Sequence, residues 1–190
     1  MTVAEAPDPH TDDEIAEGEA RRRRAVFGLV GGFLAILVII AGVQWATDSD
    51  DDDTGRALPD ATLITLDGEE FVLTSTIGEP TVVNFFASWC APCRAELPEF
   101  EEVSQTVAGE VTFVGINTRE TDVDAARELI DQTGVSYTIA LGDDGVVYEA
   151  VGGLAMPTTA FVDADGVIVE VHSGILDAGS LESKIAEHFG

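Results

Sequence analysis

Two cysteines are the residues of this chain with the clearest capacity for chemistry. Cys90 and Cys93 are the only cysteines present, and they stand three positions apart in the stretch WCAPC. Such a pair can close an intramolecular disulfide, and a thiolate at the start of a helix attacks other disulfides. We expect Cys90 to be the exposed nucleophile and Cys93, one turn further, to resolve the mixed disulfide. Pro92 suits a first turn, whose N–H groups have no helical partner.

Three other interpretations of the pair are a structural disulfide, half of a zinc site, and inert thiols. A loop this short constrains little of the unfolded chain, so a stabilising role is disfavoured. Zinc needs two further ligands, and the histidines (His10, His172 and His188) are scattered along the sequence. The sequence therefore predicts redox chemistry at the cysteines, with no cofactor and no metal.

The cysteines must be positioned by a strand before them and a helix after them. Thr81 to Ala87 reads TVVNFFA, a nearly continuous apolar run typical of a strand buried on both faces, and a helix is expected from the cysteines to about Val107. Strands that alternate with helices predict an α/β fold with a mixed sheet. The other expected strands are 62–66, 70–73, 111–116, 136–141, 159–162 and 167–171, and the other expected helices are 122–133, 143–151 and 178–189.

Residues 58–190 resemble the membrane-anchored TlpA/ResA-type thiol–disulfide oxidoreductases of the thioredoxin superfamily. The resemblance rests on VVNFFASWCAPCRAELPEF, on the later GLAMPTTAFVDADG, and on a single apolar segment near the N-terminus. It implies a thioredoxin fold, in which helices cover both faces of a mixed central sheet, with an extra helix and strand in mid-domain between residues 117 and 151. It also implies that the chain is an enzyme, a protein thiol–disulfide oxidoreductase.

The resemblance also implies roles for single residues. Cys90 and Cys93 match the redox-active disulfide, and Pro157 matches the cis-proline that faces it, which would present the Met156 backbone to a substrate chain as a short pairing edge. The alternatives are an ordinary trans proline at Pro157 and a plain packing role for Trp89. The substrate-binding residues implied in this way are Trp89, Met156, Pro157 and Thr158.

Glu96 matches a glutamate in the CxxCxxELP motif of ResA-like proteins, where it lies near the cysteines. A carboxylate there could accept or supply the proton of Cys93. The alternative is an exposed helical glutamate. The chain departs from cytosolic thioredoxins six residues before Cys90, where their buried aspartate is replaced by Asn84, which cannot titrate. Glu96 is therefore the preferred candidate for a catalytic role in proton transfer.

An apolar segment without charges, residues 25–43, precedes the domain. As a helix it would span roughly 28 Å, close to the hydrocarbon thickness of a bilayer. The arginines at 21–24 predict that the N-terminus lies inside the cell membrane and the catalytic domain outside the cytoplasm. A cleaved signal peptide is the alternative, but the run is long and no clean small-x-small site follows it, which favours an uncleaved signal anchor.

The predicted organisation has four parts. Residues 1–24 form an acidic cytoplasmic tail that ends in the arginine run, 25–43 a single transmembrane helix, 44–57 an acidic linker, and 58–190 the thioredoxin-like domain. The formal net charge of −27 opposes a nucleic-acid partner, since phosphate binding needs clustered Lys and Arg. The acidic surface is either a solvated face or an adaptation to high salt or to basic partners.

The resemblance to ResA implies partners and a direction of exchange. The substrates would be protein thiols and disulfides, apocytochrome c among them, with the protein working in the reducing direction during cytochrome c maturation. Electrons would come from a membrane thiol carrier of the CcdA/DsbD type, because the space outside the cytoplasm is not reducing by default. The alternatives are a disulfide oxidase or general exchanger on the same fold, and a non-catalytic thioredoxin-fold binding module.

Overall fold

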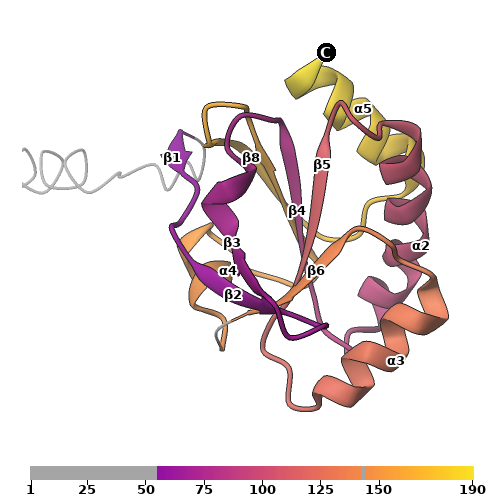
Figure 1. Cartoon of the computed structure of the whole chain (residues 1–190). Helices are drawn as coiled ribbons and strands as arrows, with labels where there is room; N and C mark the ends of the chain where they lie inside the picture. Colours follow the sequence, from indigo (N-terminus) through magenta and orange to yellow (C-terminus); the bar gives the residue numbers. More distant parts are fainter. Residues whose placement is uncertain (1–54, 143) are drawn as a thin grey trace, which may run out of the picture. The chain divides into compact units, whose positions relative to one another are not determined.

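The computed structural model describes residues 55–142 and 144–190. Its strands form one mixed sheet of eight strands in the order β1-β8-β7-β4-β5-β6-β2-β3 (Figure 1). β4, β5 and β6 are parallel, and every other pairing is antiparallel, which confirms the predicted α/β class with a mixed sheet. The strands are β1 Arg56–Ala57, β2 Thr62–Thr65, β3 Glu70–Val72, β4 Thr81–Phe86, β5 Thr112–Asn117, β6 Thr138–Leu141, β7 Thr158–Val162 and β8 Val167–Ser173.

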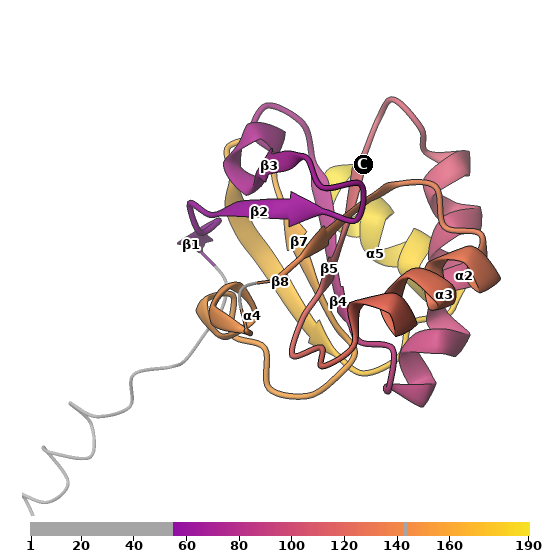
Figure 2. The ribbon, with the colours of Figure 1, turned by 60° about the horizontal axis from the view of Figure 1, so that its bottom comes forward.

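Helices cover both faces of the sheet, as expected. α2, α3 and α5 lie on one face, whereas the short α4 and the 3-10 turn η1 lie on the other (Figures 1 and 2). α3, β6 and α4 fill the chain between β5 and β7, which is the mid-domain segment that the resemblance singles out. The helices are η1 Leu73–Thr76, α2 Ala91–Thr106, α3 Val123–Thr133, α4 Val146–Ala150 and α5 Ala178–Phe189.

β4 is buried along its whole length because it lies inside the sheet with helices on both sides. Its side chains alternate between the two faces. Val82 and Phe86 pack in the clusters beneath α2, α3 and α5, and Val83 and Phe85 pack in the cluster that contains α4. The continuous apolar run therefore predicts this strand correctly, and the strand ends directly before the cysteine loop.

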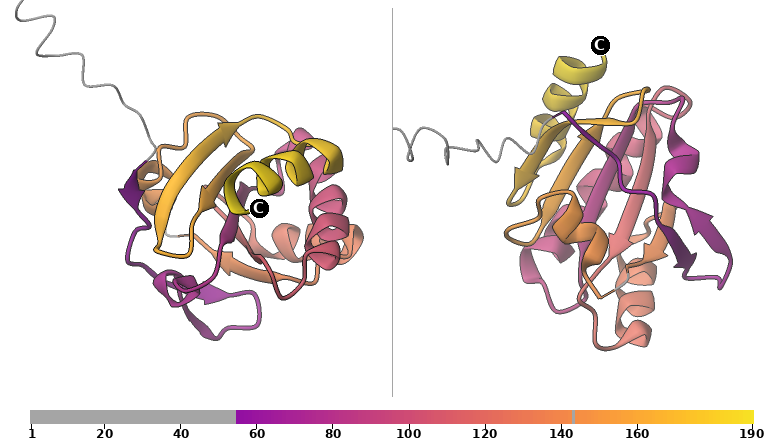
Figure 3. Two further views of the ribbon diagram at one scale, coloured as in Figure 1. Left: turned by 90° about the horizontal axis from the view of Figure 1, so that it is seen from above. Right: turned by 90° about the vertical axis from the view of Figure 1, so that its left-hand side faces the viewer.

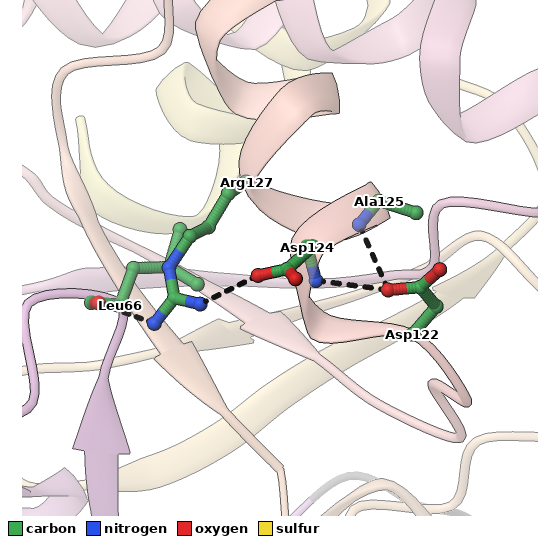
Figure 4. A network of polar contacts seen from close by, with 5 residues as sticks. All are labelled: Leu66, Asp122, Asp124, Ala125 and Arg127. Atoms are coloured by element: carbon green, nitrogen blue, oxygen red, sulfur yellow. Dashed lines mark hydrogen bonds and ion pairs between the residues drawn. The ribbon is translucent and has the colours of Figure 1, made fainter.

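α3 begins and ends at residues that its sequence identifies. Asp122 precedes it, and its carboxylate accepts hydrogen bonds from the N–H groups of Asp124 (3.1 Å) and Ala125 (3.3 Å), as Figure 4 shows. These bonds satisfy two of the N–H groups that lack a helical partner. At the other end, Gly134 adopts φ 73°, which glycine tolerates and which ends the helix.

Two short elements were not expected from the sequence. β1 pairs Arg56 and Ala57 with β8, and η1 follows β3; both are too short to carry a periodic pattern.

α5 packs against the sheet and ends at the C-terminus (Figure 3).

Within residues 55–142 and 144–190, no helix combines the length and apolar character needed to cross a membrane. The predicted tail (1–24), the predicted anchor (25–43) and most of the predicted linker lie outside the described residues.

Candidate active site

The cysteines lie at the N-terminus of α2, directly after the loop that leaves β4. Cys90 is the residue that caps the helix, with φ −85° and ψ 103°, and its Sγ accepts a hydrogen bond from the N–H of Cys93 at 3.2 Å. The two sulfurs are joined in a disulfide. The partial positive charge and unpaired N–H groups of a helix N-terminus stabilise a thiolate at this position once the disulfide is reduced.

Both cysteines are buried in the disulfide form, with exposed fractions of 4% for Cys90 and 1% for Cys93. The expectation of an exposed Cys90 is therefore wrong for this redox state. The reason is that Phe86, Leu97 and the half-buried Met156 pack with the two cysteines in one apolar cluster. Cys90 is still the more accessible of the two, and its role as the nucleophile stays a prediction.

Trp89 stands beside the disulfide with 57% of its surface exposed. Its indole Nε1–H donates a hydrogen bond to the backbone oxygen of Arg119 at 3.1 Å. So large an exposed apolar surface rules out plain core packing as its role. A substrate-binding role stays a prediction, and it is compatible with this exposure.

The Met156–Pro157 peptide bond is cis, so the alternative of an ordinary trans proline is wrong. Met156 is half-buried and packs against the cluster that contains the cysteines, whereas Pro157 and Thr158 are buried. The hydroxyl of Thr158 donates to the backbone oxygen of Ala155. The Thr158 side chain is therefore buried, and its hydroxyl is hydrogen-bonded to the chain just before the cis-proline.

Glu96 is buried on α2, with 1% of its surface exposed, so the alternative of an exposed helical glutamate is wrong. Asn84 Nδ2 donates to its Oε1 at 2.7 Å, and the N–H of Leu176 donates to its Oε2 at 2.8 Å. Burial raises the pKa of Glu96 to about 7, and the bonds from Leu176 and Asn84 oppose that rise. Asn84, which replaces an acid found in cytosolic thioredoxins, is thus a donor to this carboxyl group.

The position of Glu96 suits proton exchange with Cys93. It lies three residues after Cys93 on α2, which places both side chains on one face of the helix. A general acid or base works best when its pKa is close to the ambient pH, and burial brings Glu96 into that range. The arrangement can therefore hold a proton near the thiol that is formed when the disulfide opens.

Glu120 is a site residue that the sequence does not reveal. Its Oε2 accepts hydrogen bonds from the N–H of Ser88 (2.8 Å), two residues before Cys90, and from Asn117 Nδ2 (3.2 Å). Burial opposes ionisation of Glu120, but these hydrogen bonds outweigh it and lower its pKa. No motif marks this glutamate, because its partners are brought to it by the fold.

Across residues 55–142 and 144–190, which the structure describes, no group of three or more His, Cys, Asp or Glu side chains is arranged to hold a metal ion.

Comparisons with known proteins point to one family. The Redoxin family model matches residues 53–188. The thiol:disulfide interchange protein DsbE homolog of Paracoccus denitrificans is 32% identical over 75% of this chain and 83% of its own. The thioredoxin-like protein YneN of Bacillus subtilis is 30% identical over 69% of this chain and 78% of its own. The thiol-disulfide oxidoreductase ResA of Bacillus thuringiensis is 23% identical over 87% and 96% of the two chains.

Solved structures agree with these sequence relatives. A secreted disulfide oxidoreductase of Mycobacterium tuberculosis, homologous to E. coli DsbE, superposes with a TM-score of 0.62 at 30% identity, covering 67% of this chain and 96% of its own. DsbF of the same organism gives a TM-score of 0.63 at 32% identity, covering 70% and 98% of the two chains. With its disulfide at the start of α2, the chain therefore belongs to the Redoxin family, as a ResA-like member of the thioredoxin superfamily with protein thiol–disulfide oxidoreductase activity.

Proposed function

We propose that this protein is anchored in the cell membrane with its catalytic domain outside the cytoplasm, where it reduces disulfides in protein substrates. The observation that carries the proposal is the Cys90–Cys93 disulfide at the start of α2, with the buried Glu96 one turn beyond it. The resemblance to ResA-type proteins supports the reducing direction and apocytochrome c as a substrate.

The exchange itself follows from the positions of the two cysteines. In the reduced protein the Cys90 thiolate attacks one sulfur of a substrate disulfide, which forms a mixed disulfide and releases one substrate thiolate. Cys93 then loses its proton to Glu96, and its thiolate attacks the Cys90 sulfur. This step closes the Cys90–Cys93 disulfide and releases the second substrate thiolate. Two electrons have passed to the substrate, and both released thiolates take protons from water.

The oxidised protein needs a reductant to work again. We assign this role to a membrane dithiol carrier of the CcdA/DsbD type, since the compartment outside the cytoplasm is not reducing by default. The apolar residues 25–43, with the arginines at 21–24 before them, support a single span with the N-terminus inside. An anchor of this kind would keep the catalytic domain close to such a carrier.

The reduction potential of the Cys90–Cys93 pair tests the direction. We expect a value near that of thioredoxin, about −270 mV, measured by equilibration of the full chain with glutathione or dithiothreitol buffers. A value near that of DsbA, about −120 mV, would overturn the reducing assignment and favour the disulfide oxidase.

The assignment of the two cysteines is tested by trapping partners. A Cys93→Ser variant should accumulate mixed disulfides with substrate proteins, because Cys90 can attack and nothing resolves the product. The matched Cys90→Ser variant should trap few. If Cys90→Ser traps the partners and Cys93→Ser does not, the two roles are reversed.

A further inference from the structure

Two adjacent residues between β5 and α3, Arg119 and Glu120, accept hydrogen bonds from the loop that precedes the cysteines. We propose that Arg119 is a positioning residue, which holds the exposed Trp89 beside the disulfide and fixes it to the same helix that supports the Met156–Pro157 loop. The inference rests on the disulfide exchange of the proposed function and adds a residue that orients its substrate-binding surface.

The backbone of Arg119 makes the first contact. Its carbonyl oxygen accepts the hydrogen bond from Trp89 Nε1–H at 3.1 Å, while the next residue, Glu120, accepts from the N–H of Ser88 at 2.8 Å. Arg119 has φ 51°, in the left-handed region that costs free energy for a residue with a side chain. A conformation of this kind persists only where surrounding contacts hold it.

The side chain of Arg119 supplies those contacts on α4. Its Nη2 pairs with Glu149 Oε1 at 2.8 Å, and its guanidinium carbon lies 4.8 Å from the centre of the Tyr148 ring. The aliphatic part of the Arg119 side chain packs against Gly145, where an added Cβ would come within 3.1 Å of Arg119 Nε. An ion pair, a cation–π contact and a close backbone approach therefore join the Arg119 loop to α4.

α4 is joined in turn to the loop that ends at the cis-proline. The buried Tyr148 ring stacks edge-to-face on Phe85 of β4, with centroids 5.6 Å apart. The N–H of Gly153 donates to the backbone carbonyl oxygen of Tyr148 at 2.8 Å, and a Cβ at Gly153 would lie 2.3 Å from the Tyr148 ring. The exposed Leu154 comes next, so the chain leading to Met156 leaves from a point held by Tyr148.

Arg119 thus connects two surfaces that are far apart in the sequence. Trp89 lies on one, and the Leu154–Pro157 segment lies on the other. The resemblance to ResA-type proteins implies substrate binding for Trp89 and, in the second segment, for Met156 and Pro157. A side chain that holds them in fixed positions lowers the entropy cost of binding a protein substrate, and it leaves the reaction of Cys90 with a small disulfide unchanged.

Arg127 provides a matched control for an Arg119→Ala variant. Its side chain is 48% exposed, against 46% for Arg119. Like Arg119 it forms one ion pair, to Asp124 at 3.2 Å, and it donates to the backbone oxygen of Leu66 at 3.1 Å (Figure 4). It lies on α3, and its ion pair and hydrogen bond go to Asp124 and Leu66 rather than to Trp89 or α4. Arg127→Ala therefore removes a similar side chain without the proposed link.

The experiment uses the full chain with Trp45→Phe. The sequence has two tryptophans, so Trp89 is then the only one and its emission is measured alone. Turnover with dithiothreitol is measured on a disulfide-bonded CxxCH peptide and on bis(2-hydroxyethyl) disulfide. We expect Arg119→Ala to raise KM for the peptide about threefold to tenfold at unchanged kcat. The rate with the small disulfide should stay unchanged, and the emission of Trp89 should shift. Arg127→Ala should change none of these.

A Glu149→Gln variant gives a second, milder test, because it removes the ion pair and leaves the stacking of Arg119 on Tyr148. It should shift the peptide KM in the same direction by a smaller factor. Unchanged peptide KM and unchanged Trp89 emission in Arg119→Ala would overturn the proposal, as would an equal loss with both disulfides. A parent protein that reduces neither probe would instead refute the proposed function, and the emission of Trp89 would still decide whether Arg119 positions it.

Discussion

Glu96 shows how burial changes the chemistry of one residue. Its carboxyl group is buried on α2, and the loss of water raises its pKa to about 7. Because the unfolded value is 4.5, the folded state holds a proton between pH 4.5 and 7 that the unfolded state has released. The free energy of unfolding therefore falls as pH rises through this window, by up to about 3 kcal/mol.

Glu96→Gln should remove this pH dependence and lower the thiol pKa values. The substitution keeps the size of the side chain and deletes the negative charge that disfavours a thiolate nearby. We expect the free energy of unfolding of the oxidised protein to vary less between pH 5 and pH 8. In the reduced protein, the alkylation rate of the cysteines should rise at a lower pH than in the parent.

The control for this substitution is Glu99→Gln, which changes another glutamate of α2 that bonds to the backbone of Ala178 and not to Asn84. Glu99→Gln should leave the pH dependence of cysteine alkylation unchanged. Alkylation curves of the parent and Glu96→Gln that superimpose would show that solvent handles the proton of Cys93. Neighbouring acids that interact titrate as a coupled set, so the measured pKa values are assigned to the two thiols and the carboxyl group together.

Among the secondary-structure elements, α2 is held by Glu101 to Ser136, two residues before β6 begins. The Glu101 carboxylate accepts hydrogen bonds from the N–H of Ser136 (2.8 Å), from the Ser136 hydroxyl (2.6 Å) and from Gln105 (2.6 Å). Burial opposes ionisation of Glu101, but these bonds outweigh it and lower its pKa. Glu101 therefore acts on stability in the opposite sense to Glu96: its contribution is present at neutral pH and is lost as pH falls through its lowered pKa.

Glu101→Ala should lower the free energy of unfolding by about 2–3 kcal/mol at pH 7, because it removes hydrogen bonds to a charged group. The difference from the parent should shrink in strong acid, where the parent carboxyl group is protonated. Urea unfolding at pH 7 and in acid measures both values. Glu102→Ala, at an exposed position on the same helix, should change stability by less than about 0.5 kcal/mol. Equal losses from the two substitutions would contradict the assigned role of Glu101.

At the scale of the whole molecule, the proposed topology places the disulfide outside the cytoplasm. After mild reduction, a membrane-impermeant maleimide should label Cys90 and Cys93 in intact cells, because in the proposed topology the arginines at 21–24 would keep the N-terminus inside. Mass spectrometry of the recovered protein measures the labelling. A Cys90→Ser, Cys93→Ser double variant is the control for background. Labelling that occurs only after the cells are lysed would contradict the topology.

Features that depend on neighbours along the chain can be predicted from the sequence alone. The spacing of Cys90 and Cys93 predicts a disulfide, the apolar run from Thr81 predicts β4, and Asp122 with Gly134 marks the ends of α3. Each of these is local, because hydrophobic periodicity, caps and turns act over a few residues. The match to the TlpA/ResA-type proteins adds the cis peptide bond before Pro157, which no local pattern indicates.

The burial and the partners of the site residues follow from the folded arrangement and not from any local pattern. Glu96 receives a hydrogen bond from Leu176, 80 positions along the chain, and another from Asn84 on a neighbouring strand. Cys90 is buried because Met156 packs in the same cluster, and the contact of Arg119 with Trp89 joins two loops 30 positions apart. A pKa or an exposed fraction depends on all the groups around a side chain. Those groups come from distant segments that only the folded sheet brings together.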